Sequence, residues 1–176
     1  MIQHQVVWLT GLSGAGKTTI SVKVANRLES HGLKVLTLDG DVVRSKREIP
    51  LGFSPEDIRV NNMLIIEICQ ESLPDYDVIL VPVISPFADS RANAKETLGN
   101  SMIEVYVRVS LEEASRRDPK GLYRDQESGK LQGLVGVEDE VPYQPPENPN
   151  LILDTESLDA DSCASELADH ILGRSQ

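Results

Sequence analysis

The sequence is poor in cysteine, in aromatic side chains and in long apolar runs. Its two cysteines, Cys69 and Cys163, lack the CxxC or Cys/His spacing of a zinc site and are too few for a disulfide framework. No apolar run approaches the ~18 residues that a membrane-spanning helix needs. The N-terminus also lacks the basic, apolar and small-residue pattern of a secretory signal. We therefore expect a cytoplasmic protein with reduced thiols.

Cationic residues are scarce as well. The 176 residues contain 17 Lys and Arg against 28 Asp and Glu, a formal net charge of -11. This balance argues against nucleic acid and against anionic membranes as partners, although a local basic pocket can still bind a small anion. With 40% apolar and 26% charged residues, the chain is typical of one soluble domain, which we expect to span residues 1–176.

Short β-rich runs alternate with helical patterns along the chain. This alternation predicts an α/β fold of three layers, with a mainly parallel five-stranded sheet and helices on both faces. The polar stretch at about 118–150 is too long for an ordinary connection, so we expect it to form a lid over a site. Strands are expected at 4–10, 33–39, 76–84, 102–109 and 150–154, and helices at 17–30, within 55–73, and at 88–98, 111–117 and 160–172.

The stretch GLSGAGKT, residues 11–18, fits the phosphate-binding pattern G-x-x-x-x-G-K-[ST]. Its glycines allow consecutive backbone N–H groups to point inward at phosphate oxygens, and the following helix adds its positive end. We expect Lys17 to reach the β- and γ-phosphates of ATP and the Thr18 hydroxyl to join a Mg²⁺ shell. The full set expected to bind ATP is Gly11, Ser13, Gly14, Ala15, Gly16, Lys17, Thr18 and Thr19.

Two aspartates, Asp39 and Asp41, follow the second expected strand, at the sheet edge where ligands bind in open α/β folds. They are too close in sequence to share one face of a regular element unless Gly40 turns the chain. Such a pair can hold hydrated Mg²⁺ or orient a hydroxyl for attack. An exposed Asp-Gly turn without function is the alternative.

The motifs GLSGAGKTT, LDGDVVR, LGFSPED, ISPF followed by an arginine, and RDPKGLY occur in this order. With them the chain resembles the adenylyl-sulfate (APS) kinases from about Val6 to Leu172. These P-loop kinases transfer the γ-phosphate of ATP to the 3′-hydroxyl of adenylyl sulfate and give PAPS. The resemblance therefore implies ATP and Mg²⁺ as cofactors, a nucleotide-like small molecule as acceptor, and a homodimer, since family members often dimerise.

The resemblance also implies roles for individual residues. Lys17, Asp39, Asp41 and Lys120 would be catalytic, with Asp41 nearest the acceptor hydroxyl and Thr18 and Asp39 on the metal. Arg117 would serve the ATP side at the start of the lid. The residues expected to contact the acceptor nucleotide are Asp41, Arg44, Phe53, Arg59, Asn61, Ile84, Ser85, Lys120 and Leu134, and Arg91 falls on a recurring arginine of the family. A core position for Phe53, and solvated surface positions for Arg44 and Arg91, are the alternatives.

Two positions depart from the family pattern on the acceptor side. Ile58 stands where an arginine is expected, and Leu134 stands where an aromatic residue closes over the acceptor base. Loss of one such arginine weakens anion binding by about ten- to a hundredfold, unless Arg59 substitutes for it.

These departures leave open a different hydroxyl-bearing acceptor for the same chemistry. A regulatory nucleotide-binding domain without turnover is a further alternative, and the intact Lys17, Thr18 and Asp41 argue against it. A GTP switch is not favoured, because the sequence has no Asn-Lys-x-Asp motif.

Overall fold

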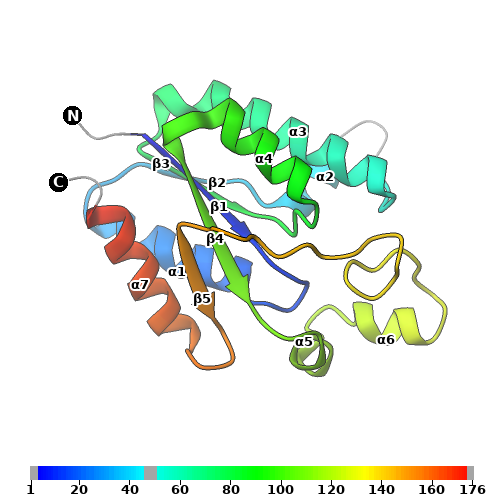
Figure 1. Ribbon diagram of the computed structural model, residues 1–176. Coiled ribbons are helices and arrows are strands. Elements are labelled where there is room, and N and C mark those ends of the chain that lie inside the picture. The colour runs from blue at the N-terminus through cyan, green and yellow to red at the C-terminus, as the bar shows by residue number, and fades with distance from the viewer. Residues whose placement is uncertain (1–3, 46–50, 174–176) are drawn as a thin grey trace.

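The computed structural model describes residues 4–45 and 51–173 (Figure 1). A five-stranded sheet runs through the molecule in the order β2-β3-β1-β4-β5. Every neighbouring pair is parallel, which confirms the predicted α/β class. The strands are β1 (Gln5–Thr10), β2 (Val35–Thr37), β3 (Val78–Pro82), β4 (Met102–Arg108) and β5 (Leu151–Asp154).

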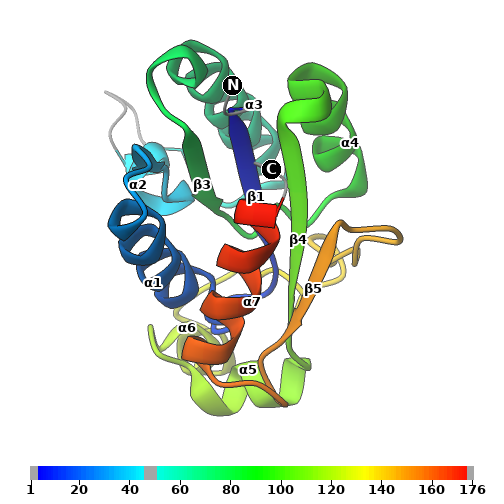
Figure 2. The ribbon, with the colours of Figure 1, turned by 90° about the vertical axis from the view of Figure 1, so that its left-hand side faces the viewer.

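Helices cover both faces of this sheet. In Figures 1 and 2, α3 and α4 lie on one face, and α1 and α7 lie on the other. The helices are α1 (Lys17–Ser30), α2 (Gly40–Ser45), α3 (Pro55–Ser72), α4 (Ala88–Leu98), α5 (Leu111–Arg117), α6 (Leu122–Glu127) and α7 (Ala160–Gly173), with short 3₁₀ turns at Leu73–Asp75 and Gly99–Ser101. The predicted helices are all present within a few residues of their expected bounds, and α2 and α6 were not predicted.

The central strand β1 is apolar from Val6 to Leu9 because both of its faces are covered. Val7 and Leu9 pack in the cluster under α1 and α7. Val6 and Trp8 pack in the cluster under α3 and α4. Because successive side chains of a strand point to opposite faces, a strand covered on both sides needs apolar residues at every position.

The second strand is shorter than expected. It pairs only with β3, over Val35–Thr37, instead of extending over 33–39. It is one of the two edge strands of the sheet, and α2 begins at Gly40, shortly after it.

Helix α3 begins as predicted, with Ser54 as its N-cap. The Ser54 hydroxyl accepts a hydrogen bond from the Asp57 backbone N–H at 3.1 Å. Met63 lies on the outer side of this helix and is 53% exposed. The buried side instead carries Ile58, Ile65, Ile66 and Cys69, together with Asn61 and Asn62.

The segment at 118–150 is ordered around the short helix α6. The Asp118 carboxylate accepts hydrogen bonds from the backbone N–H groups of Tyr123 and Arg124, at 3.2 and 3.1 Å. The Tyr123 hydroxyl donates to the carbonyl oxygen of Ser13 at 2.9 Å, so the segment contacts the phosphate loop directly.

Both cysteines are free and buried. In the described part of the chain no helix combines the length and apolarity needed to cross a membrane.

Candidate active site

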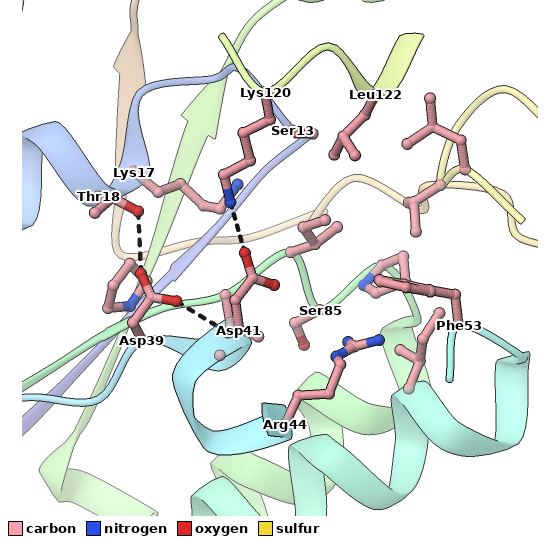
Figure 3. Close-up of a pocket in the computed structure, with 18 of the residues that line it drawn as sticks. Ser13, Lys17, Thr18, Asp39, Asp41, Arg44, Phe53, Ser85, Lys120 and Leu122 are labelled. Carbon is pink, nitrogen blue, oxygen red and sulfur yellow. Dashed lines mark hydrogen bonds and ion pairs between the residues drawn. The ribbon is translucent and has the colours of Figure 1, made fainter. Parts of the chain in front are cut away.

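A cavity of about 420 Å³ opens at the carboxyl edge of the sheet. Parallel strands bring their carboxyl ends to one edge, so the loops that follow β1, β2 and β3 meet there. The walls come from five segments, which are the phosphate loop around Lys17, the α2 region with Asp41, residues 51–62 with Phe53, the stretch after β3 with Ser85, and the predicted lid with Lys120 (Figure 3).

The loop between β1 and α1 has the conformation that its glycines predict. Gly14 and Gly16 adopt φ values of 79° and 101°, which residues with a Cβ rarely adopt. Gly16 is the N-cap of α1, and no side chain caps this end of the helix. The first backbone N–H groups of α1 are therefore free to bind an anion, in the field of the helix dipole.

Lys17 is buried beneath this loop. Its Nζ donates hydrogen bonds to the carbonyl oxygens of Gly11 and Leu12, both at 2.8 Å. Burial, with a smaller contribution from the charge of Lys120, lowers the pKa of Lys17 from 10.5 to about 7, although Asp41 and Asp39 act to raise it. Among the described residues no carboxylate forms an ion pair with this amine, which is bound by the two carbonyl oxygens.

We expect ATP binding to be coupled to proton uptake at Lys17. In the free protein a pKa of about 7 leaves this amine largely neutral above pH 7. Phosphate oxygens beside it favour the charged form and raise the pKa, so binding should take up as much as about one proton per site between about pH 7 and pH 9. Titration calorimetry in buffers of different ionisation enthalpy measures this uptake.

The matched control for this titration is Lys17→Arg, because a guanidinium stays charged throughout that range. The proton uptake of the variant, subtracted from that of the wild type, removes the contribution of ATP itself. Equal uptake by both proteins at pH 8 would contradict the assignment.

The acidic pair is built by a chain reversal at Gly40. Asp39 accepts a hydrogen bond from the Asp41 backbone N–H at 2.9 Å, and α2 begins between them. A Cβ on Gly40 would lie 2.8 Å from Cγ2 of Val83, so the turn requires glycine. The Asn61 amide holds the carbonyl of Gly40 at 3.2 Å. The pair therefore lies at an organised helix start, with Gly40 buried between the two aspartates.

Asp41 forms an ion pair with Lys120 at the cavity. The Lys120 Nζ lies 2.5 Å from its Oδ2, although the two residues are 79 positions apart in sequence (Figure 3). Burial acts to raise the pKa of Asp41, but the hydrogen bond and charge of Lys120, followed by the charges of Arg44 and Lys17, hold it below its usual value. Asp41 is therefore a carboxylate at neutral pH.

The side chains of Thr18 and Asp39 bring two oxygen atoms together beside the phosphate loop. The Thr18 hydroxyl donates to Oδ2 of Asp39 at 3.2 Å, at the mouth of the phosphate loop (Figure 3). No group of three or more His, Cys, Asp or Glu able to hold a metal occurs among the described residues. This donor set fits Mg²⁺, which commonly takes one or two protein oxygens and completes its shell with phosphate oxygens and water.

Phe53 and Arg44 form a cationic and aromatic corner of the cavity. The Arg44 guanidinium lies 4.6 Å from the centroid of the Phe53 ring, and its Nη1 donates to the Gly52 carbonyl at 2.6 Å. Phe53 is 51% exposed and lines the cavity, so the alternative that it belongs to the core is wrong. An exposed ring of this kind, fixed by an arginine, is suited to stack on a base.

A family model described as adenylylsulphate kinase matches residues 3–154. The chain belongs to the adenylylsulphate kinase family. It is therefore a P-loop phosphotransferase, with the adenylyl-sulfate kinase activity that converts APS into PAPS.

Individual relatives agree with this assignment over most of their length. The probable adenylyl-sulfate kinase of Aeropyrum pernix is 43% identical over 156 residues, which cover 86% of this chain and 84% of the relative. An adenylyl-sulfate kinase of Synechococcus sp. is 45% identical over 158 residues, covering 89% and 88%. Among solved structures, the Mycobacterium tuberculosis APS kinase CysC in complex with AMPPNP and APS is similar with a TM-score of 0.90 and 34% identity, covering 98% of this chain and 99% of that chain.

Several residues expected in the site of this kinase do not line the cavity. Arg59 forms an ion pair with Asp89 at 3.0 Å and lies 4.2 Å from the Phe87 ring centroid. This position disagrees with the prediction that Arg59 replaces the missing arginine. Asn61 is fully buried, and its contact with Gly40 gives it an indirect role. In place of these two, Ile58 and Asn62 of α3 line the cavity.

The other two arginines of the expected site, Arg117 and Arg91, likewise do not line the cavity. Arg117 donates to Glu113 at 2.8 Å and to the Thr155 carbonyl at 2.7 Å, and reaches the Gly14 carbonyl only at 3.5 Å. It thus supports the phosphate loop from outside the cavity. Arg91 is 4% exposed, so its alternative as a solvated surface charge is wrong.

The apolar side of the cavity was not predicted from the sequence. Besides the predicted Leu134, which is 5% exposed, this side includes Leu51, Leu122, Leu131 and Val135. The signal was present, because leucines at 122, 131 and 134 stand out in an otherwise polar stretch. In Figure 3, Leu122 and Lys120 project from the same segment toward the cavity.

Proposed function

We propose that this cavity joins the two substrates of the kinase, with ATP on the Lys17 side and APS on the Phe53 side. The observation that carries the proposal is the convergence of Lys17, Asp41 and Lys120 on one cavity. A carboxylate and two amines on one cavity are suited to a reaction in which a hydroxyl attacks a highly charged phosphate.

On the donor side, the phosphate loop would bind the β- and γ-phosphates through backbone N–H groups and Lys17. Thr18 and Asp39 would hold Mg²⁺, which when bound supplies positive charge to the phosphate oxygens. Their hydroxyl and carboxylate oxygens already lie 3.2 Å apart, so little rearrangement is needed.

On the acceptor side, Asp41 would accept the hydrogen bond of the 3′-hydroxyl and orient it for attack. A bond then forms between the 3′-oxygen and the γ-phosphorus, the bond from phosphorus to the bridging oxygen of ADP breaks, and the hydroxyl proton passes to Asp41. Lys120 pairs with Asp41 in the free protein. An incoming γ-phosphate carries more negative charge than Asp41, and drawing Lys120 to the phosphate would free the carboxylate for the hydroxyl.

The apolar side formed by Leu122, Leu131 and Leu134 would exclude water from the transferring phosphate. Exclusion of water matters because phosphoryl transfer to an organic hydroxyl competes with hydrolysis. The role of residues 118–150 as a closing lid remains a prediction, as does the homodimer, which light scattering of the purified protein would test.

We expect Phe53→Ala to raise the KM for APS by about tenfold, because base stacking on an aromatic ring contributes ~1–3 kcal/mol. The KM for ATP should stay unchanged, and the half-exposed ring contributes little to folding. Steady-state kinetics with each substrate varied in turn measures both constants. Ile152→Ala, which removes another exposed apolar side chain on β5, is the control and should change neither constant.

The proposal is tested by incubating the purified protein with Mg-ATP, with and without APS, and following ADP and PAPS. We expect ADP release that depends on APS and equals the PAPS formed. ADP release that depends on another hydroxyl compound but not on APS would overturn the acceptor assignment. ATP binding without turnover for any acceptor would favour the regulatory alternative.

A further inference from the structure

Arg91 of α4 is a buried cation without a role in the mechanism above. Its Nε pairs with Oε1 of Glu104 on β4 at 3.0 Å, and both side chains are almost fully covered. Its Nη1 donates to the Ser85 carbonyl at 2.7 Å, and its Nη2 donates to the Gln144 carbonyl at 2.6 Å. Burying a charge is costly, so a guanidinium whose three nitrogens all have partners indicates a specific task for this side chain.

One contact of Arg91, the Ser85 carbonyl, belongs to the wall of the cavity. Ser85 lines the cavity and has a φ of 43°, in a region that residues other than glycine rarely adopt. Such a conformation costs of order 1–3 kcal/mol and persists only where the surroundings impose it. Here the Ser85 carbonyl is held by Arg91 and also accepts from the Thr10 hydroxyl at 3.2 Å.

The neighbours of Ser85 are fixed in the same way. The Ile84 carbonyl accepts from the Thr10 hydroxyl at 2.5 Å and from the Gly11 N–H at 3.4 Å. The Pro86 carbonyl accepts from the Gln144 N–H at 2.9 Å. The three consecutive carbonyl groups of this wall are therefore bound by groups other than a substrate.

The remaining contact of Arg91 reaches the far end of the predicted lid. Gln144 lies near the end of the 118–150 segment, and its side-chain oxygen accepts from the Ala88 N–H at 2.7 Å, where α4 begins. The adjacent Tyr143 hydroxyl lies 3.0 Å from Oγ1 of Thr10. One guanidinium thus connects β4, the cavity wall and the base of the lid.

We propose that Arg91 is a positioning residue that sets the affinity for the acceptor through the Ser85 wall, without touching the acceptor itself. This inference rests on the proposed function, because it assigns Ser85 to the APS side of the cavity. A displacement of about 1 Å in a group that positions a substrate can cost on the order of a hundredfold in rate. An arginine with only a structural role would affect stability and leave the substrate constants alone.

Two variants distinguish a positioning role of Arg91 from a purely structural one. Arg91→Lys keeps the charge beside Glu104, but its single nitrogen cannot reach Glu104, Ser85 and Gln144 together. The double variant Arg91→Met with Glu104→Met removes both charges, so that no unpaired charge stays buried and folding is preserved. For both we expect the KM for APS to rise by about ten- to a hundredfold, with the KM for ATP within about twofold of the wild type.

Arg108→Lys is the matched control, because Arg108 forms an exposed ion pair with Asp154 at 2.7 Å, outside the cavity. It should change neither KM. Amide hydrogen exchange adds a measurement that needs no turnover. Exchange of the Gln144 N–H, which donates to the Pro86 carbonyl, and of the Ala88 N–H, which donates to Gln144, should be faster in Arg91→Lys than in the wild type, and unchanged in the control.

The outcomes separate this inference from the proposed function. A wild type that forms no PAPS from APS contradicts the proposed function, and the exchange experiment then still decides whether Arg91 holds the wall. An active wild type, with variants that lose thermal stability but keep the KM for APS, overturns the role of Arg91. An equal rise in both KM values overturns it as well, because the effect is then not confined to the acceptor.

Discussion

Replacing Asp41 with asparagine should lower kcat by about 10²–10⁴-fold, the usual contribution of a positioned general base. The amide keeps the shape of the side chain and can still accept a hydrogen bond, but it cannot take the proton of the acceptor hydroxyl. ATP binding should change little, because the Thr18 and Asp39 pair and the phosphate loop stay intact. Single-turnover measurement of phosphate transfer, with saturating substrates, isolates this step.

The matched control is Asp89→Asn. Asp89 is likewise an aspartate whose pKa is lowered, although partial burial opposes this, by the hydrogen bond and charge of an adjacent cation, Arg59. It lies outside the cavity, so its replacement should leave kcat unchanged. A similar loss in both variants, or full activity in Asp41→Asn, would remove Asp41 from the chemical step.

The role of Asp41 as the base also predicts where activity is lost at acid pH. Asp41 works as the carboxylate, which exists above its pKa, and the Lys120 hydrogen bond and charge oppose the effect of burial and lower that pKa. The acid limb of kcat/KM, which reports the free enzyme in which Lys120 pairs with Asp41, should therefore lie at a lower pH than the pKa of an ordinary aspartate allows. Lys120→Met, besides lowering kcat, should move the acid limb to higher pH because the opposing cation is gone.

Much of the fold and the donor half of the site follow from local sequence. The phosphate loop is a contiguous motif between a strand and a helix, and Asp39 and Asp41 follow the next strand, so no long-range information was needed to place them together. The parallel sheet then brings these segments together, because the carboxyl ends of β1, β2 and β3 lie at one edge.

The acceptor half depends on information that a motif does not contain. Each residue along α3 turns by about 100°, so an uncertainty of one position decides whether a side chain enters the cavity. Ile58 and Asn62 line it, whereas Arg59 and Asn61 point to Asp89 and to Gly40. The pairing of Lys120 with Asp41, and of Arg91 with Gln144, joins segments that only the tertiary structure brings together.

Replacing Lys17 with methionine should abolish measurable transfer, with a loss in kcat of at least about 10²–10³-fold, as for removal of a preorganised group that stabilises developing charge. Methionine fills a similar volume beneath the phosphate loop but offers no charge to the β- and γ-phosphates. ADP release with saturating APS, followed at high enzyme concentration, measures the residual rate. Activity close to that of the wild type would overturn the assignment of the phosphate loop.

The stability of this variant should move in the opposite direction from its activity. The pKa of Lys17 is about 7 in the folded protein and 10.5 as a reference, so the unfolded chain binds more protons between these values. This lysine therefore opposes folding most at pH 7 and below, and its unfavourable contribution disappears as the pH rises toward 10.5. We expect Lys17→Met to have an equal or higher Tm than the wild type at neutral pH, with the difference shrinking at alkaline pH. A large fall in Tm would show instead that the hydrogen bonds to Gly11 and Leu12 outweigh the cost of the buried charge, and that loss of activity reports a collapsed loop.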